Sequence, residues 1–429
     1  MSKADGLRLL AAEKARQAVA SNQISPMVPA APSPPPTAPV LTWPANQSMP
    51  DDADHSFADG AAHLSHHWDL DGMYAARSSG VAVVFVNRSG TGVAVAQMTA
   101  SGALDPSFGV GGWVTDPTAT AATVDSAGRV LLHQWLQRWE YVQRPAPYYY
   151  PEMIVESTVR RLNGDGNPDT SFAGTGSVLY TKQTSEDFDT AVATCRATML
   201  PRGESVVIAY TEDTRRRCSR NGLVHISGDG TVDDQWGAAA LNDPTPAAVT
   251  ALGAGPNGST IVAARRTYRI TSAGAIDPTF HPPHDDWLGI RMVLLARPYD
   301  VASTSDGGLF ALRRTSLTGG NMSIVSPNGT MLTTIENAGQ WTVFGPAVLI
   351  ADGPRAVTVD IHGPPGQVRI AARRSDGTAD LTYNGRGQAS WTPPFGSQRF
   401  AVTRSGNRYL AAGQAADGRV WVSRAAPPA

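Results

Sequence analysis

The stretch SGALDPSFGVGGWV, residues 101–114, returns in altered form along the chain. Its copies align on the glycine that precedes an acidic position, and these glycines are Gly102, Gly166, Gly230, Gly274, Gly329 and Gly377. An element that recurs many times within one chain indicates architecture rather than a single binding loop. The sequence therefore predicts a repeat fold.

Two columns of side chains persist through these copies. The acidic column contains Asp105, Asp169, Asp233, Asp277 and Asp380 and is lost at Leu332, and the aromatic column contains Phe108, Phe172, Trp236, Phe280 and Tyr383, with Ile335 in the odd copy. An Asp near Ser or Thr is typical of a tight turn whose carboxylate accepts backbone N–H groups. We predict that each Asp shapes a turn and that each aromatic packs between neighbouring sheets. Because no charged partner stands at a fixed offset, we expect none of these Asp residues to be catalytic.

A second feature recurs between the copies: a small turn followed by a β-rich run, as in VDSAGRVLLH and TRSGNRYLAA. Its turn glycines are Gly80, Gly128, Gly203, Gly258, Gly307, Gly353 and Gly406. Three or four short strands in each repeat are typical of a β-propeller blade. We predict an all-β chain that forms one seven-bladed β-propeller, with six or eight blades as alternatives. Closure of the ring should bring residues 419–424 beside strands near residues 64–100, because an unpaired edge invites aggregation.

The copies resemble the delta-60 repeat, a bacterial propeller-type repeat recognised by an LDxSFGxxG element, a turn and a following hairpin. The resemblance covers residues ~64–424 and is most specific at 101–115, 163–178 and 375–391. It departs from the pattern at Leu332 and in the histidine-containing loop after Phe280. The resemblance implies a propeller-like fold and supplies no catalytic residues to transfer.

Two further regions precede the repeats, which we place at residues 61–429. Residues 1–22 have helical character, with Leu7 and Leu10 on one face. Residues 23–60 form a proline-rich arm that we expect to be extended and to form neither a ladder nor a helix. The arm is either a plain linker or a strap laid along a partner, with Trp43 as an anchor.

Composition excludes some partners and compartments. A formal net charge of −2 gives no electrostatic footprint for nucleic acid or for an acidic membrane. We find no secretory signal and no apolar run long enough to span a bilayer, so we expect cytoplasmic synthesis, with a virion or an extracellular assembly as alternative destinations. Cys195 and Cys218 are predicted to be free thiols.

Patterns typical of a metal or catalytic site are incomplete. Asn163, Asp165, Asn167 and Asp169 alternate as calcium ligands do, but the Glu that an EF-hand loop needs at its twelfth position is replaced by Gly174. Histidines and acids also gather at 51–69 and at 281–286, without the spacing of a zinc site, and we interpret them as a solvated linker and a loop tip. We predict no catalytic residue, no metal and no cofactor.

The largest departure from the repeat is an aromatic insertion at residues 134–153. It contains Trp135, Trp139, Tyr141, Tyr148, Tyr149 and Tyr150. Insertions on a repeat fold are common binding surfaces, and Tyr and Trp provide a large contact area at low entropic cost. This loop either covers its own blade or is a candidate binding surface, for a protein in the first place and for a glycan as the alternative. An arginine-rich segment at 215–220 is interpreted as a solvated loop tip.

These observations predict a non-enzymatic structural or docking propeller. We expect it to be part of a larger assembly, such as a phage tail or head-to-tail virion protein, attached through residues 1–50. Two alternatives remain open: a surface-associated or exported propeller that recognises a glycan or protein, and a hydrolase or lyase with its site in the central channel.

Overall fold

The computed structural model describes residues 40–42, 62–76, 80–87, 91–143, 149–185, 192–214, 219–241, 249, 251–264, 267–281, 300–314, 319–340, 348–362, 367–383, 385–394, 399–405 and 408–425. The chain divides into two units, Met1–Pro39 and Val40–Ala429, and all described residues lie in the second. The predicted N-terminal helix with Leu7 and Leu10, and the arm residue Trp43, lie outside the described residues.

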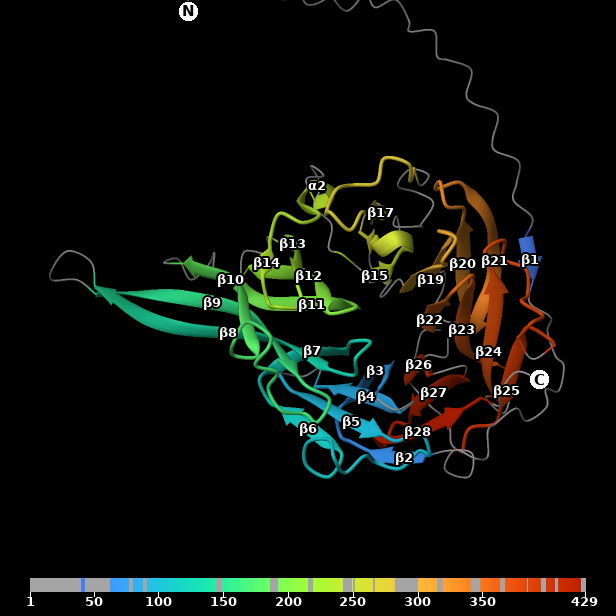
Figure 1. Cartoon of the computed structure of the whole chain (residues 1–429), viewed down its shortest axis with the longest axis horizontal. Coiled ribbons are helices and arrows are strands. Elements are labelled where there is room, and N and C mark those ends of the chain that lie inside the picture. The colour runs from blue at the N-terminus through green and yellow to red at the C-terminus, as the bar shows by residue number, and fades with distance from the viewer. Residues whose placement is uncertain are drawn as a thin grey trace, which may run out of the picture. The chain divides into compact units, whose positions relative to one another are not determined.

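The second unit is a seven-bladed β-propeller built from small antiparallel sheets (Figure 1), as the repeats predict. The first four blades consist of β3 (Asp69–Ala75), β4 (Val81–Val86), β5 (Val93–Met98) and β6 (Trp113–Asp116); β7 (Ala119–Val124), β8 (Val130–Gln143), β9 (Tyr149–Leu162) and β10 (Ser177–Ser185); β11 (Val192–Arg202), β12 (Ser205–Thr214), β13 (Ser219–Ile226) and β14 (Val232–Asp233); and β15 (Ala251–Ala254), β16 (Thr260–Ala263) and β17 (Thr267–Ile270).

The remaining blades complete the circle. They consist of β18 (Asp300–Ser303), β19 (Leu309–Arg314), β20 (Gly319–Val325) and β21 (Met331–Gln340); β22 (Val348–Asp352), β23 (Arg355–His362), β24 (Gln367–Arg374) and β25 (Gln388–Trp391); and β26 (Arg399–Ser405), β27 (Arg408–Gln414) and β28 (Arg419–Arg424) with β2 (Ala62–Ser65). A short helix α2 (Ala238–Leu241) and a 3-10 turn η3 (Pro256–Gly258) lie in the connections. One pairing, Gln340 with Ile361, joins the strands of the fifth and sixth blades into a single sheet.

The innermost strands form a closed ring. Each blade's first strand contacts the first strand of the next, in the order β3, β7, β11, β15, β18, β22, β26 and back to β3. The last blade is completed by the N-terminal strand β2, which pairs with β28 so that Leu64 lies opposite Val420. This pairing confirms the predicted closure, although β2 becomes the outer strand of the last blade rather than part of the first.

The core lies between the blades, with one apolar cluster at each of the interfaces. The cluster between blades 7 and 1 joins Met73 to Leu410, for example, and the cluster between blades 1 and 2 joins Val84 to Leu132. Strands β4 and β5 are buried at every position because blades cover both of their faces. Their nearly continuous apolar sequences follow from this double coverage.

The repeated element forms the predicted turn. The carboxylate Oδ1 of Asp105 accepts hydrogen bonds from the backbone N and the Oγ of Ser107 at 2.9 and 2.6 Å, and Asp169 binds Ser171 in the same way. All six aligned glycines have φ between 85° and 93°, a region that favours glycine, and this explains their column. The aromatic column is buried, from 0% exposed at Phe108 to 5% at Phe280.

One prediction about the acidic column is wrong, because a charged partner does stand at a fixed offset in two copies. Arg161 and Arg269 lie eight residues before Asp169 and Asp277, and each donates its Nε to the carboxylate Oδ2, at 2.8 and 2.7 Å. Each guanidinium also covers the ring of its own aromatic, with the Cζ of Arg161 4.6 Å from the centre of the Phe172 ring. We call this Arg–Asp–aromatic set the arginine staple.

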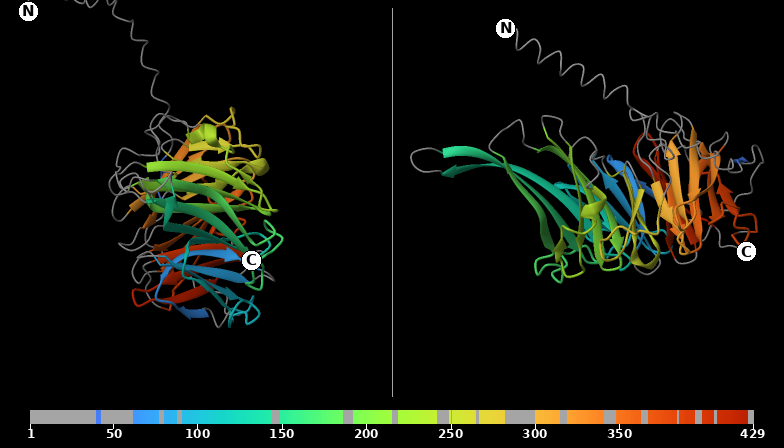
Figure 2. Two further views of the ribbon diagram at one scale, coloured as in Figure 1. Left: turned by 90° about the vertical axis from the view of Figure 1, so that its left-hand side faces the viewer. Right: turned by 90° about the horizontal axis from the view of Figure 1, so that it is seen from above.

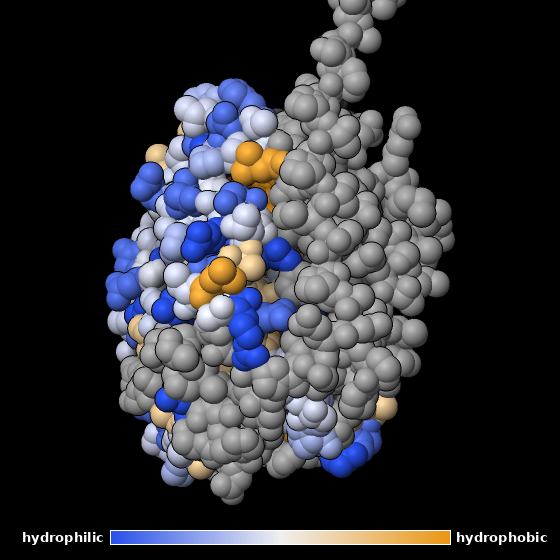
Figure 3. All heavy atoms as spheres, turned by 90° about the vertical axis from the view of Figure 1, so that its right-hand side faces the viewer, coloured by the Kyte–Doolittle hydropathy of each residue, from blue (hydrophilic) through white to orange (hydrophobic). Residues whose placement is uncertain are grey.

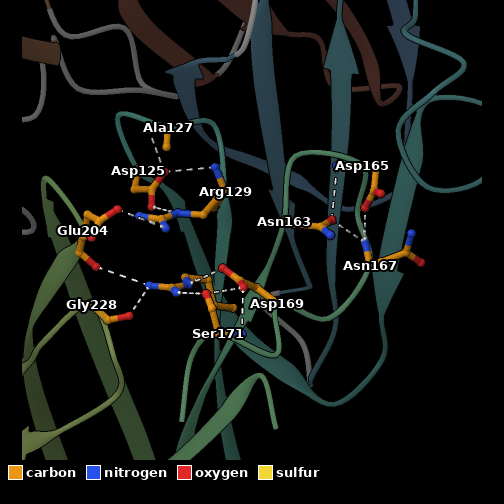
Figure 4. Close-up of polar contacts among 11 residues, drawn as sticks. Asp125, Ala127, Arg129, Asn163, Asp165, Asn167, Asp169, Ser171, Glu204 and Gly228 are labelled. Carbon is orange, nitrogen blue, oxygen red and sulfur yellow. Dashed lines mark hydrogen bonds and ion pairs between the residues drawn. The ribbon is translucent and has the colours of Figure 1, made fainter. Parts of the chain in front are cut away.

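The arginine staple crosses to the next blade. Nη1 of Arg161 donates to the carbonyl of Gly228 in blade 3 at 2.8 Å (Figure 4), and Nη1 of Arg269 donates to the carbonyl of Pro327 in blade 5 at the same distance. At the interface between blades 7 and 1, where the ring closes, Arg424 of β28 donates to the carbonyl of Ala100, also at 2.8 Å. These three carbonyls each lie two residues before an aligned glycine. Arginine side chains therefore donate hydrogen bonds to equivalent turns across several of the interfaces between blades.

The fifth copy of the repeat and the proline-rich arm both differ from prediction. The aligned segment MLTTIE lies in strand β21 and forms no turn, since it has neither the Asp nor a following glycine. In the arm, Val40–Thr42 forms a short strand, β1, whose parallel partners on β21 are Thr334, Ile335 and Glu336. The arm can form this ladder because these three residues lie between Pro39 and Pro44 and keep their N–H groups.

Candidate functional site

The aromatic insertion is a β-hairpin and not the loop that we predict from the sequence. Strands β8 and β9 each contain 14 residues and pair in unbroken register from Val130 with Leu162 to Gln143 with Tyr149. The hairpin projects from the ring well beyond the neighbouring blades (Figures 1 and 2). The alternation of large and polar residues in QWLQRWEYVQ favours a strand. This alternation is a better guide to the structure than the length of the insertion, which suggests a loop.

The six predicted aromatic residues do not share one environment. Trp135 lies near the base, where it packs against the buried Met153 and Val155. Trp139 lies farther out, and 44% of its surface is exposed. Tyr141, Tyr149 and Tyr150 lie in the paired strands, whereas Tyr148 lies outside the described residues.

Leu136 is a neighbour that the sequence analysis missed. It is 43% exposed, and strand alternation places it on the opposite face from Trp135 and Trp139. We call the part of the hairpin beyond Trp135, residues 136–143 and 149–156, its outer half, and it presents large apolar side chains on both of its faces. By contrast, the described surface on the side of the ring shown in Figure 3 is mostly hydrophilic, with small and separate apolar patches.

Charged side chains flank Leu136 on its face of the hairpin. Arg138 binds both Glu140, at 2.8 Å, and Glu156, and Lys182 of β10 lies 3.4 Å from Glu156. The hydrogen bond from Arg138 holds the pKa of Glu156 below its usual range. These exposed ion pairs contribute little to stability, and they leave a polar border around an apolar centre.

A buried polar cluster supports the base of the hairpin. Nε2 of His133 lies 2.8 Å from the hydroxyl of Tyr180, and its Nδ1 lies 2.6 Å from Oγ1 of Thr120. Tyr180 is an extra residue in β10, because Leu179 pairs with Thr158 and Thr181 with Ser157. This β-bulge turns the tyrosine toward His133. Burial lowers the pKa of His133 to about 4 and raises that of Tyr180.

The neighbouring thiol belongs to the same buried cluster. Sγ of Cys195 lies 4.0 Å from Oγ of Ser157, and burial together with Glu212 raises the pKa of the thiol to about 12. Glu212 is itself fully buried and accepts a hydrogen bond from Gln183. A thiol with so high a pKa is unreactive as a nucleophile. Cys195 is free, as predicted, and Cys218 lies outside the described residues.

We expect the stability of the protein to fall in mild acid because of His133. Its pKa is about 4 in the folded protein and near 6.5 when unfolded, so only the unfolded chain takes up this proton between those values. The stabilisation is complete above pH 6.5 and is lost as the pH falls, by about 3 kcal/mol in total. Urea unfolding of His133→Gln at several pH values should show a smaller decrease. The exposed His281→Gln is the control, and an unchanged decrease in His133→Gln would contradict this assignment.

The candidate calcium loop is a set of turns. Oδ1 of Asn163 accepts the backbone N–H groups of Asp165 and Asn167 at 3.3 and 3.1 Å, and Oδ1 of Asp165 accepts that of Asn167 at 2.9 Å (Figure 4). Two of the candidate ligand oxygens, Oδ1 of Asn163 and Oδ1 of Asp165, thus accept hydrogen bonds from the backbone of the turn itself. Within the described ranges, no group of three or more His, Cys, Asp or Glu residues could hold a metal ion.

The first histidine cluster lies partly inside the fold, which differs from our interpretation of a solvated linker. His66 is half-buried and stacks on Phe85 and Trp113, with ring centres 5.0 and 5.5 Å apart. Burial, with the neighbouring His67, lowers its pKa.

Residues 51–61, 215–218 and 282–299 lie outside the described residues. No helix among the described residues is long and apolar enough to cross a membrane.

Solved structures with a related fold contain enzyme propellers. The chain is similar to the Hadza microbial sialidase Hz136 (11% identity, TM-score 0.38, covering 84% of this chain and 65% of that one) and to a Trypanosoma rangeli sialidase (7%, 0.36, 84% and 54%). It is also similar to prolyl oligopeptidase B from Galerina marginata (12%, 0.41, 82% and 47%). The chain thus spans about half to two thirds of these proteins. No family model and no curated protein matches the sequence.

These comparisons contradict our main functional prediction. The matching propellers belong to sialidases and a prolyl oligopeptidase, which are hydrolases, and they give no support to a docking component of a virion. At such low identity the likeness shows the fold alone. The catalytic chemistry of those enzymes is therefore not transferred to this chain.

Proposed function

We propose that the protein is a recognition propeller that binds a partner protein through the outer half of the β8–β9 hairpin. The observation that carries this proposal is the exposure of Leu136 and Trp139, at 43% and 44%, on a hairpin that projects from the ring. Large exposed apolar residues with a polar border are characteristic of interaction surfaces. The propeller supplies a rigid base, and the cluster around His133 holds the hairpin to it.

A protein fits this surface better than a glycan does. A sugar ring stacks on one face of an aromatic side chain, and that would leave Leu136 on the other face unused. A groove in a partner protein can surround the hairpin and bury both faces. The paired charges of Arg138, Glu140 and Glu156 would then lie at the rim, where they set orientation more than affinity.

Truncation of the exposed side chains tests this function. We expect Trp139→Ala to weaken binding of a purified partner by about 30-fold, the effect of losing ~2 kcal/mol at a central aromatic. Leu136→Ser should weaken the same complex. The partner is first identified by comparing proteins captured by the wild type and by a variant in which a two-residue Asn-Gly turn replaces residues 138–154. Affinities are then measured by isothermal titration calorimetry.

Leu381 provides the matched control, because it is 58% exposed but lies in blade 6. Leu381→Ser should bind the partner as the wild type does. Equal affinity in Trp139→Ala, Leu136→Ser and wild type would contradict the proposal. In this proposal the propeller recognises its partner without catalysing a reaction, so hydrolysis that is lost on substituting a single channel carboxylate would overturn that part.

We also propose that the repeats are of the delta-60 type. The shared turn of Asp105 and Asp169, the positive φ of each aligned glycine and the buried aromatic give the LDxSFG pattern a structural reason. This supports the family assignment at the level of the repeated element.

A further inference from the structure

A cavity of about 330 Å³ opens between blades 1 and 2, away from the outer half of the hairpin. Its wall comes from β6 and the β6–β7 connection, from the blade-2 strands β8 and β9, and from the turn that follows β9. Its volume is at the lower end of the range for small-molecule sites. Among the described residues of the wall, Asp116 and Arg160 are the charged ones.

Arg160 and its neighbour Arg161 use their guanidinium groups differently. Arg161 is buried and spends Nε, Nη1 and Nη2 on Asp169, Gly228 and Ser171. In the described part of the chain, the side chain of Arg160 makes one hydrogen bond, from Nη1 to Oδ2 of Asp116 at 2.7 Å, and 35% of this side chain is exposed. Within the described residues its Nε and Nη2 have no hydrogen-bond acceptor, so one edge of the guanidinium retains its donors.

Asp116 holds Arg160 in place and does not itself bind the ligand, because both of its carboxylate oxygens accept hydrogen bonds from the protein. Its Oδ1 accepts hydrogen bonds from N and Oγ1 of Thr118 at 2.8 and 2.6 Å, and from N of Ala119 at 3.1 Å. Its Oδ2 accepts a hydrogen bond from Gln134 at 3.1 Å in addition to that from Arg160. Held by this saturated carboxylate, Arg160 is oriented before any ligand binds, which reduces the entropic cost of binding.

The rest of the wall determines which ligand fits. Val114, Pro117 and Pro168 provide the accessible apolar surface, and Leu132 and Leu162, which are 1% and 3% exposed, lie behind it as a fixed apolar floor. A guanidinium edge with two N–H donors matches a planar carboxylate. A phosphate would bring a second negative charge, and the part of the wall that the structure describes contains no second cation to balance it.

We propose that this cavity binds a small carboxylic acid with a compact apolar body. The carboxylate accepts hydrogen bonds from Nε and Nη2 of Arg160, and the apolar body lies against Val114, Pro117 and Pro168. This site is independent of the recognition hairpin, so neither proposal depends on the other.

The test uses benzoate and 3-methylbutanoate as probes, each compared with its uncharged amide. Titration followed by NMR should give dissociation constants on the order of 1 mM for the acids, with the amides bound at least about 10-fold more weakly. Arg160→Gln should remove the preference for the acids. Thr115→Phe, at an exposed wall position that makes no contact with the Asp116–Arg160 pair in the described hydrogen bonds, should block both kinds of probe.

Arg419→Gln is the matched control, because Arg419 is an exposed arginine of blade 7. It should bind the acids as the wild type does. Equal binding of acid and amide, unchanged acid binding in Thr115→Phe, or no acid binding by the wild type would each overturn the proposal. If Arg160→Gln fails to fold, the comparison of acid with amide and the Thr115→Phe variant decide the outcome.

Discussion

Replacing Asp169 with Ala should destabilise the propeller by about 3–5 kcal/mol, because it leaves the buried charge of Arg161 without its carboxylate. The Arg161 side chain is only 2% exposed, and its Nε lies 2.8 Å from Oδ2 of Asp169. Although burial acts to raise it, the pKa of Asp169 is lowered by the Ser171 hydroxyl and by Arg161, so the pair is charged at neutral pH. Urea unfolding at pH 7, followed by tryptophan fluorescence, measures the loss.

The repeat itself supplies the control for this substitution. Asp105 makes the same two bonds to Ser107, but eight residues before it stands Gln97 instead of an arginine. Asp105→Ala removes only the turn contacts and should cost about 1 kcal/mol. Arg161→Met combined with Asp169→Ala should recover much of the loss, since no unpaired charge remains. Equal costs for Asp169→Ala and Asp105→Ala would show that the arginine staple adds nothing to the turn.

The staple shows where the sequence is informative and where it is not. The glycine and aromatic columns can be predicted because backbone geometry and burial demand one residue type in nearly every copy. Arg161 and Arg269 share an offset that alignment could have revealed, but the equivalent positions in blades 1 and 3 are Gln97 and His225, so the column is not uniform. A position that is occupied by different residue types in different blades is hard to recognise from the sequence before the contacts are known.

The hairpin illustrates a second limit. Alternation in residues 134–143 favours strand, and the aromatic content correctly directs attention to this segment, yet exposure separates Trp139 from Trp135 only in three dimensions. The bulge at Tyr180 depends on a register shift in β10, which no local pattern predicts. Nor could the sequence distinguish Arg160 from Arg161, because their roles follow from the opposite faces of β9.

Replacing Phe108 with Ala should destabilise the propeller by about 3–5 kcal/mol. Phe108 is fully buried in the cluster between blades 1 and 2, together with Val95, Leu132 and Leu162. Removal of its ring leaves a cavity at the interface between two blades, and several strands would have to move together to fill this cavity. The cost should therefore approach the upper part of the range for a buried phenylalanine.

Val110 tests whether this cost comes from burial or from the turn as a whole. It lies two residues later in the same turn and is 87% exposed, so Val110→Ala should change the free energy of unfolding by no more than about 0.5 kcal/mol. The two variants are compared by thermal and urea unfolding, and by affinity for the partner of the hairpin. A folded Phe108→Ala protein of unchanged stability that no longer binds that partner would contradict the structural role of the repeat. Loss of stability, with binding retained below the unfolding temperature, would place the element in the frame of the propeller and leave recognition to the hairpin.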